Sequence, residues 1–207
     1  MKTILLIGGK AGSGKDTIAT LLHKKLNNAN TNAYIVHNAD KVKQISREVF
    51  GWDSLKNDLG RQLLVNVTKT GYDYDKYFWE KYTYQFIKTT ILKSMKDEFI
   101  IIPDWRYPST KEYFDMISQI EYKDLQVKTI LVESNNIDDV ASNSKDTVIR
   151  ESEDTIPNKP KNYFDYIIDN TTHIDTGRYI PTSVFKRLLG DDLYEFLKLN
   201  DSESKVF

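Results

Sequence analysis

One stretch near the amino terminus constrains the fold more than any other part of this 207-residue chain. The aliphatic run Ile4-Leu5-Leu6-Ile7 leads into a glycine-rich segment, and apolar residues at 18, 21, 22 and 26 then share one face of a helix. A buried strand that turns through glycines into a helix is typical of a phosphate-binding loop. Its GxxxxGK pattern is filled by Gly9, Gly14 and Lys15.

The residue types in this loop suit polyphosphate chemistry. Glycines let successive backbone N–H groups point at phosphate oxygens, and the start of the following helix favours negative charge. The lysine meets the β and γ phosphates as a point charge. We therefore predict that the loop binds ATP through Gly9, Lys10, Ala11, Gly12, Ser13, Gly14, Lys15, Asp16 and Thr17.

The position after the loop lysine departs from the general pattern. Asp16 stands where most such loops carry Ser or Thr as a magnesium ligand, and Thr17 supplies a hydroxyl one residue later. A carboxylate here would repel the phosphates unless a cation lies between them. We expect Mg²⁺ to be held through Asp16, Thr17 or a bridging water, and the sequence does not choose among them.

Composition narrows the class of protein. The balance of 29 basic and 30 acidic residues favours neither a nucleic acid polymer nor a membrane as partner, and no apolar run spans a bilayer. The absence of cysteine excludes thiolate chemistry, and the three histidines show no ligand spacing and lie near no candidate site. We predict a cytoplasmic protein; whether it forms a homodimer the sequence leaves open.

Short apolar segments alternate with helical patterns along the chain. This alternation predicts a single α/β domain over residues 1–207, with a five-stranded parallel sheet covered by helices on both faces. The expected strands are Lys2–Ile7, Ala33–His37, Glu98–Ile102, Val127–Glu133 and Phe164–Asp169. A last helix is predicted over Thr182–Leu199. Ligands of such sheets bind beyond the carboxyl ends of the strands, where Asp40, Asp104, Arg106 and Asn170 are expected.

An insertion of helical character separates the second and third strands. Residues 40–95 are too many for one crossover helix, and we predict that they bind an acceptor molecule. Their first part reads as a helix ended by Gly51, with Lys43 and Arg47 on its polar face. The face predicted to turn inward carries Val42, Ile45, Val49 and Phe50.

Aromatic residues at helical spacing dominate the second half of the insertion. Most of them are expected to form a core stripe, while Trp79 or Tyr82 is a candidate for stacking on a nucleobase. The residues placed on one side are Tyr74, Phe78, Trp79, Tyr82, Phe86 and Ile87.

Three further segments carry candidate residues. Asp104 and Arg106 directly follow a predicted strand, where an acid can orient a magnesium-bound water and an arginine can reach a phosphate. The polar segment 134–162 lacks an obvious core and is predicted to be a lid over the phosphates, with Arg150 as its clamping cation. Asn170 follows the fifth strand, where an adenine is expected.

Several of these motifs together resemble the bacteriophage deoxynucleoside monophosphate kinases. The segment Gly9–Thr17, with an Asp-Thr pair after the loop lysine, and Ile102-Pro103-Asp104-Trp105-Arg106 carry the resemblance most specifically. Weaker matches follow in the same order, namely Ala39 through Lys43, Phe50-Gly51, Leu59-Gly60, Asp75 with Trp79, and Asp165 through Asn170. Arg61 and the segment around Arg150 depart from the family's pattern.

The resemblance implies transfer of the γ-phosphoryl group of ATP to a deoxynucleoside monophosphate. In that scheme Lys15 holds donor phosphates, Lys43 and Arg106 contact the acceptor's phosphate, and Asp104 serves the magnesium shell. We assign the acceptor to Asp40, Lys43, Arg47, Arg61, Trp79 and Arg106, and catalysis to Lys15, Asp104, Arg106 and Arg150. The alternatives are a kinase for a small non-nucleotide acceptor, such as dephospho-coenzyme A or a phosphorylated metabolite, and an ATP-dependent switch without kinase activity.

Overall fold

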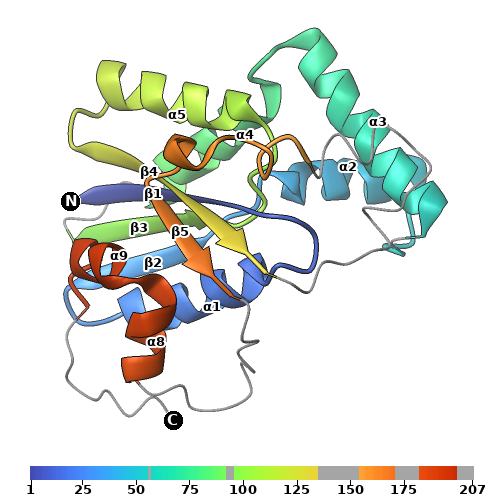
Figure 1. Cartoon of the computed structure of the whole chain (residues 1–207). Helices are drawn as coiled ribbons and strands as arrows, with labels where there is room; N and C mark the ends of the chain where they lie inside the picture. The colour runs from blue at the N-terminus through green and yellow to red at the C-terminus, as the bar shows by residue number, and fades with distance from the viewer. Residues whose placement is uncertain (56, 92–95, 135–153, 171–181, 200–207) are drawn as a thin grey trace.

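A parallel sheet forms the centre of the molecule (Figure 1). The computed structural model describes residues 1–55, 57–91, 96–134, 154–170 and 182–199. Within these ranges the five strands follow the order β2-β3-β1-β4-β5 and pair in parallel, which confirms the predicted fold class. They are β1 (Lys2–Gly8), β2 (Thr31–Ile35), β3 (Asp97–Ile102), β4 (Leu125–Glu133) and β5 (Tyr166–Asp169).

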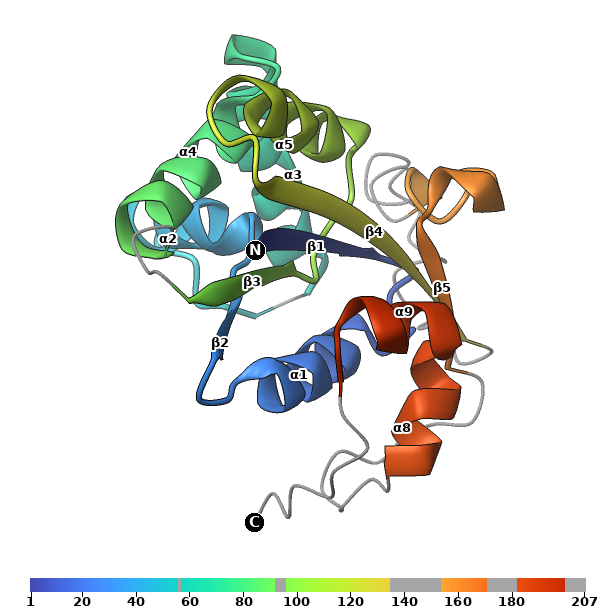
Figure 2. The same cartoon turned by 90° about the vertical axis from the view of Figure 1, so that its left-hand side faces the viewer.

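Both faces of the sheet are buried, as the continuous apolar strands require. Because side chains alternate along β1, Leu5 and Ile7 join one core cluster while Ile4 and Leu6 join the other. The first cluster packs under α1 (Lys15–Leu26), α8 (Thr182–Leu189) and α9 (Asp191–Phe196). The second packs under α5 (Pro108–Ile120) and the end of the insertion, and Figure 2 shows the two layers.

The segment between β2 and β3 projects beyond the edge of the sheet where the strands end (Figure 1). It contains α2 (Ala39–Phe50), α3 (Asp58–Tyr74), α4 (Phe78–Phe86) and the π-helix η1 (Ile87–Ile91). Gly51 ends α2 in a left-handed conformation with φ of 65°, as predicted. A further short 3-10 helix, η2 (Lys161–Tyr163), precedes β5.

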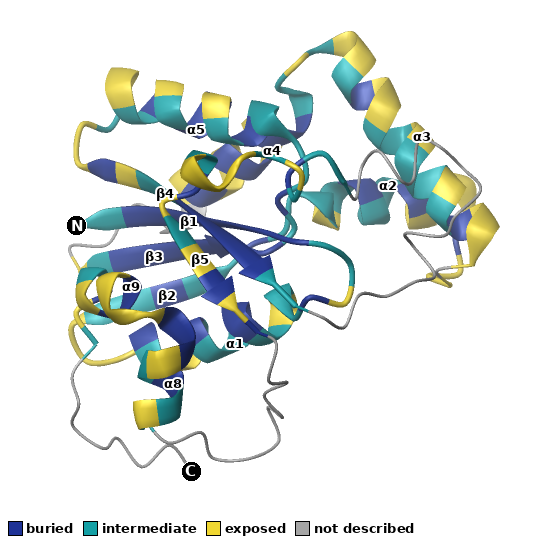
Figure 3. Cartoon of the chain, viewed as in Figure 1, coloured by how far each residue is buried: buried dark blue, intermediate teal, exposed yellow. Residues whose placement is uncertain are grey.

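The predicted buried faces of the insertion are partly wrong. Val49 and Phe50, expected inward, are 69% and 58% exposed. Figure 3 shows exposed positions along the helices of the insertion. Tyr74, Tyr82 and Phe86 are also exposed. The buried face of α4 and η1 instead follows Glu80, Thr83, Tyr84 and Ile87, together with Trp79.

Two further expectations change. The single helix predicted over Thr182–Leu199 breaks at Gly190, whose φ of 75° and ψ of 158° no helix can contain. The predicted lid, 134–162, lies largely outside the described residues, and with it Arg150. Its described end is not coreless, because Ile156 is fully buried in the cluster that contains Trp105.

Candidate functional site

The phosphate loop joins β1 to α1 through glycines in positive-φ conformations. Gly9, Gly12 and Gly14 have φ values of 152°, 76° and 92°. A Cβ at Gly9 would lie 2.6 Å from the Val132 carbonyl oxygen and 2.7 Å from Ser13 Oγ, so this position has no room for a side chain. The backbone conformation and the start of a 12-residue helix together fit a polyphosphate cradle.

Asn170 braces this loop from the end of β5. Its Nδ2 donates to the Ser13 carbonyl at 3.0 Å, and its backbone N–H donates to the Glu133 carbonyl at 2.8 Å. A Cβ at Gly14 would collide with the Asn170 amide. The structure thus places Asn170 beside the loop, as predicted; contact with an adenine stays a prediction.

A cavity of about 420 Å³ extends from the phosphate loop into the insertion. Its loop end is lined by Ala11, Gly12, Lys15 and Asp16. Lys43, Arg61 and Arg106 also line it, so its walls carry four cations, Lys15 included, against the two carboxylates of Asp16 and Asp104. The insertion adds a less polar part lined by Leu64, Val65, Thr68, Tyr72, Trp79 and Tyr107.

Asp104 holds the first turn of α2 at the edge of this cavity. Its Oδ1 accepts the Asn38 N–H at 3.0 Å and its Oδ2 accepts the Ala39 N–H at 2.8 Å. The carboxylate therefore compensates the unpaired N–H groups of a helix start. Asp104, the acid predicted at the end of the third strand, thus lines the cavity. It also stabilises the start of α2, a role that the sequence did not indicate.

The predicted magnesium ligands do not all meet in the cavity. Asp16 and Asp104 line it, whereas Thr17 does not. The described part of the chain contains no group of three or more His, Cys, Asp or Glu arranged to hold a metal. Mg²⁺ is usually bound through one or two carboxylates together with substrate phosphates, and Asp16 beside the loop fits that donor set.

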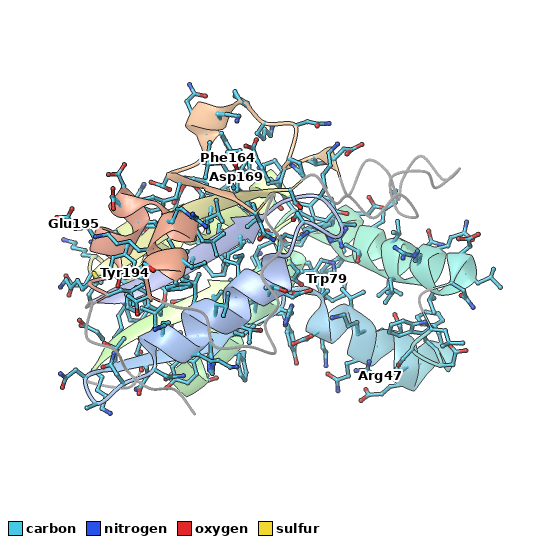
Figure 4. The ribbon with its side chains drawn as sticks, turned by 60° about the horizontal axis from the view of Figure 1, so that its bottom comes forward. Arg47, Trp79, Phe164, Asp169, Tyr194 and Glu195 are labelled. Atoms are coloured by element: carbon cyan, nitrogen blue, oxygen red, sulfur yellow. The ribbon has the colours of Figure 1, made fainter. Side chains whose placement is uncertain are left out.

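Several predicted acceptor residues lie elsewhere. Arg47 is exposed, does not line the cavity and lies on the side of α2 away from Trp79 (Figure 4). Asp40 is exposed outside the lining and pairs with Lys43 at 3.5 Å. Tyr82 is 47% exposed, outside the lining and beneath the Lys41 ammonium. Trp79 does line the cavity, although it is only 3% exposed.

Sequence reasoning missed His37. It lines the cavity, and its Nδ1 lies 3.9 Å from Asp104 Oδ2, so the expectation that no histidine lies near a candidate site is wrong. The available signal was its place at the carboxyl end of the second predicted strand, Ala33–His37.

A buried carboxyl group was also missed. Glu80 is fully buried, and its Oε1 accepts hydroxyl groups from Tyr72, Ser109 and Thr110, each at 2.9 Å. Burial and the neighbouring Glu80 raise the pKa of the Tyr72 hydroxyl far above its usual value. The signal for Glu80 was its spacing with Thr83, Tyr84 and Ile87 on one helical face, which the count of aromatic residues obscured.

Comparison with known proteins yields no family. No family model matches the chain, and no curated protein sequence matches it. Three similar solved structures are an APS kinase, CysC, of Mycobacterium tuberculosis in complex with AMPPNP and APS, a thymidylate kinase of Ehrlichia chaffeensis and a gluconokinase of Sinorhizobium meliloti. Their sequence identities are 14%, 13% and 9%, and their TM-scores 0.43, 0.40 and 0.40.

The alignments cover 94%, 84% and 95% of this chain and 98%, 90% and 94% of those chains. Together with the loop geometry, the strand order defines the chain as an α/β protein with a phosphate-binding loop. Among the described helices none is both long and apolar enough to cross a membrane.

Proposed function

We propose that the protein transfers the γ-phosphoryl group of ATP to the phosphate of a deoxynucleoside monophosphate. The observation that carries this proposal is the continuous cavity, which runs from the phosphate loop past Lys43, Arg61 and Arg106 to an aromatic and aliphatic part in the insertion. This distribution suits a donor triphosphate, a second phosphate and a flat apolar base. The preference for a deoxyribose and the phage-type assignment rest on the motif resemblance alone.

The proposed reaction needs positioning more than proton transfer. A nucleotide phosphate has a second pKa of ~6, so at neutral pH it is already an anionic nucleophile. In this proposal Lys15 neutralises charge on the donor phosphates, while Arg61 and Arg106 hold the acceptor phosphate in line. Magnesium held through Asp16, with Asp104 also on the cavity lining, would supply further neutralisation of the β and γ phosphates.

A second candidate function follows from His37. A kinase for a small acceptor with a hydroxyl group requires a residue that takes the hydroxyl's proton, and His37 beside Asp104 offers one. The two functions respond differently to His37→Gln. Transfer to a nucleotide phosphate should keep its rate above pH 6, whereas transfer to a hydroxyl should lose about 100-fold or more in turnover.

The test of the proposal is acceptor-stimulated release of ADP from ATP and magnesium. The panel holds the four common deoxynucleoside monophosphates and their ribose counterparts, with Lys15→Ala as the blank. Stimulation by at least one deoxynucleotide supports the proposal and gives the sugar preference directly. If ATP binds but no nucleotide stimulates ADP release, the proposal fails; the small-molecule kinase or the ATP-dependent switch then becomes the better account.

A further inference from the structure

Two residues that line the insertion end of the cavity carry hydroxyl groups whose hydrogens are already used in hydrogen bonds. Thr68 and Tyr72 stand one turn apart on α3, and both line the cavity. Thr68 Oγ1 donates to the Leu64 carbonyl at 2.8 Å, and the Tyr72 hydroxyl donates to Glu80 Oε1 at 2.9 Å. Each hydroxyl oxygen can therefore only accept a hydrogen bond from a ligand, because its own hydrogen is already donated.

The indole of Trp79 adds no donor at this end. Its Nε1–H donates to the Thr68 carbonyl at 2.8 Å, so the ring offers the cavity an apolar surface. The Trp79 ring also packs against Gly71, where a Cβ would collide with it, so α3 and α4 are held closely together. A base that enters this part of the cavity meets aromatic surface and, at Thr68 and Tyr72, hydrogen-bond acceptors.

Glu80 fixes the direction of the Tyr72 hydrogen. Its Oε1 receives three hydroxyl groups, and its buried Oε2 has no hydrogen-bond partner in the described structure. Oε1 accepts the hydroxyl groups of Tyr72, Ser109 and Thr110 together, which directs the hydrogens of these groups toward it. Thr110 also accepts from Asn38 Nδ2 at 3.5 Å, which uses its second hydrogen-bonding direction.

We propose that this end of the cavity selects nucleobases that carry an exocyclic amino group. The inference rests on the proposed function and specifies its acceptor. The amino groups of cytosine, adenine and guanine can donate to Thr68 and Tyr72, whereas the keto oxygen that replaces the amino group in uracil or hypoxanthine meets lone pairs and loses both partners. Glu80 is a positioning residue, since it acts through Tyr72.

Two matched nucleotide pairs test the proposal. dCMP and dUMP differ at the amino or keto group of position 4 and the linked N3 proton, and dAMP and dIMP differ at the amino or keto group of position 6 and the linked N1 proton. We expect kcat/KM and the dissociation constant, measured by calorimetry, to favour the amino member of at least one pair by about tenfold. Equal values in both pairs, or a preference for the keto members, would overturn the proposal.

Variants connect the preference to the residues. Tyr72→Phe and Thr68→Val keep the size of the side chain and remove the acceptor, so each should reduce the preference toward unity. Glu80→Met frees the Tyr72 hydrogen and should also reduce the amino-to-keto ratio, an effect that a uniform loss of stability would not produce. An unchanged ratio in all three variants, with folding confirmed by circular dichroism, contradicts the assignment.

Tyr84→Phe is the matched control. Tyr84 is a buried tyrosine of the neighbouring α4 whose hydroxyl donates to Glu121 Oε2 at 2.6 Å, and it does not line the cavity. The Tyr84→Phe variant should lose a comparable tyrosine–carboxylate hydrogen bond and keep the preference for one base over the other. If no nucleotide is bound or phosphorylated at all, both this inference and the proposed function fail. If nucleotides are phosphorylated without a base preference, only the inference fails.

Discussion

The two ends of the cavity achieve their chemistry by different means. At the phosphate loop the backbone forms the site, through positive-φ glycines and the start of α1, and a hydrogen bond from Asn170 holds the loop in place. At the insertion end the side chains do it, through a network in which Tyr72, Glu80 and Thr110 come from three separate helices. A loop built on backbone geometry suits a phosphate common to every nucleotide, while a side-chain network can distinguish one acceptor from another.

The largest effect is expected at the loop end. Lys15→Ala should lower kcat/KM by about 1000-fold, because the donor phosphates lose their point charge at the moment negative charge must be neutralised. Steady-state kinetics with ATP checks this, and an unchanged melting temperature shows that the fold is intact. Turnover of the Lys15→Ala variant at the wild-type rate would contradict the assignment of the donor phosphates to this loop.

Arg106→Ala should affect binding of the acceptor and leave binding of ATP almost unchanged. We expect the KM of the acceptor to rise by about 30- to 100-fold, since a charge-assisted contact to its phosphate is lost, while the dissociation constant of ATP changes by less than about twofold. Calorimetry with ATP alone and kinetics with varied acceptor give the two values. Weakened binding of ATP to the same degree would place Arg106 at the donor instead.

Gly71→Ala should disturb the insertion alone. The new Cβ would press on the Trp79 indole, and overpacking of this kind costs about 1–3 kcal/mol of the free energy of unfolding. The displaced ring should also raise the KM of the acceptor several-fold. Gly51→Ala is the matched control: its Cβ would meet nothing within 4 Å, but the left-handed φ of 65° makes it cost about 1–2 kcal/mol of stability through backbone strain alone. It should therefore leave the acceptor KM unchanged.

The smallest effect concerns the scaffold that both ends share. Asp165 joins β5 to β4 by accepting the Thr129 N–H at 2.9 Å, the Thr129 hydroxyl at 2.7 Å and the Lys128 ammonium at 3.1 Å. Burial raises the pKa of Asp165, but these hydrogen bonds outweigh burial and bring its pKa below the ordinary 3.8. Asp165→Asn should therefore cost about 1 kcal/mol of stability at pH 7, with little change in kcat.

The pH dependence of that cost has a defined sign. A carboxyl group with a depressed pKa in the folded state contributes its stability above the pKa of the unfolded chain and loses it as the pH falls through the folded pKa. Urea unfolding at pH 7 and at pH 3 should show the difference between wild type and Asp165→Asn shrinking at the lower pH. A difference that grows on acidification contradicts this interpretation.

The contrast between the two ends also explains what the sequence could predict. The phosphate loop, the five strands and the Gly51 stop were predictable, because glycine placement and apolar runs encode local backbone conformation directly. The Glu80 network was not, because Ser109 and Thr110 lie 29 and 30 residues further along the chain and meet Glu80 only after folding. Val49 and Phe50 show that an apolar helical face need not be covered by a neighbour.

A bisubstrate ligand tests the central claim, that one cavity holds a donor and an acceptor phosphate side by side. The ligand is adenosine joined through five phosphates to a deoxynucleoside, and its binding is measured by calorimetry. We predict one ligand per chain, binding at least 100-fold tighter than ATP and weakened by both Lys15→Ala and Arg106→Ala. Affinity equal to that of ATP, with no effect of Arg106→Ala, would contradict the account.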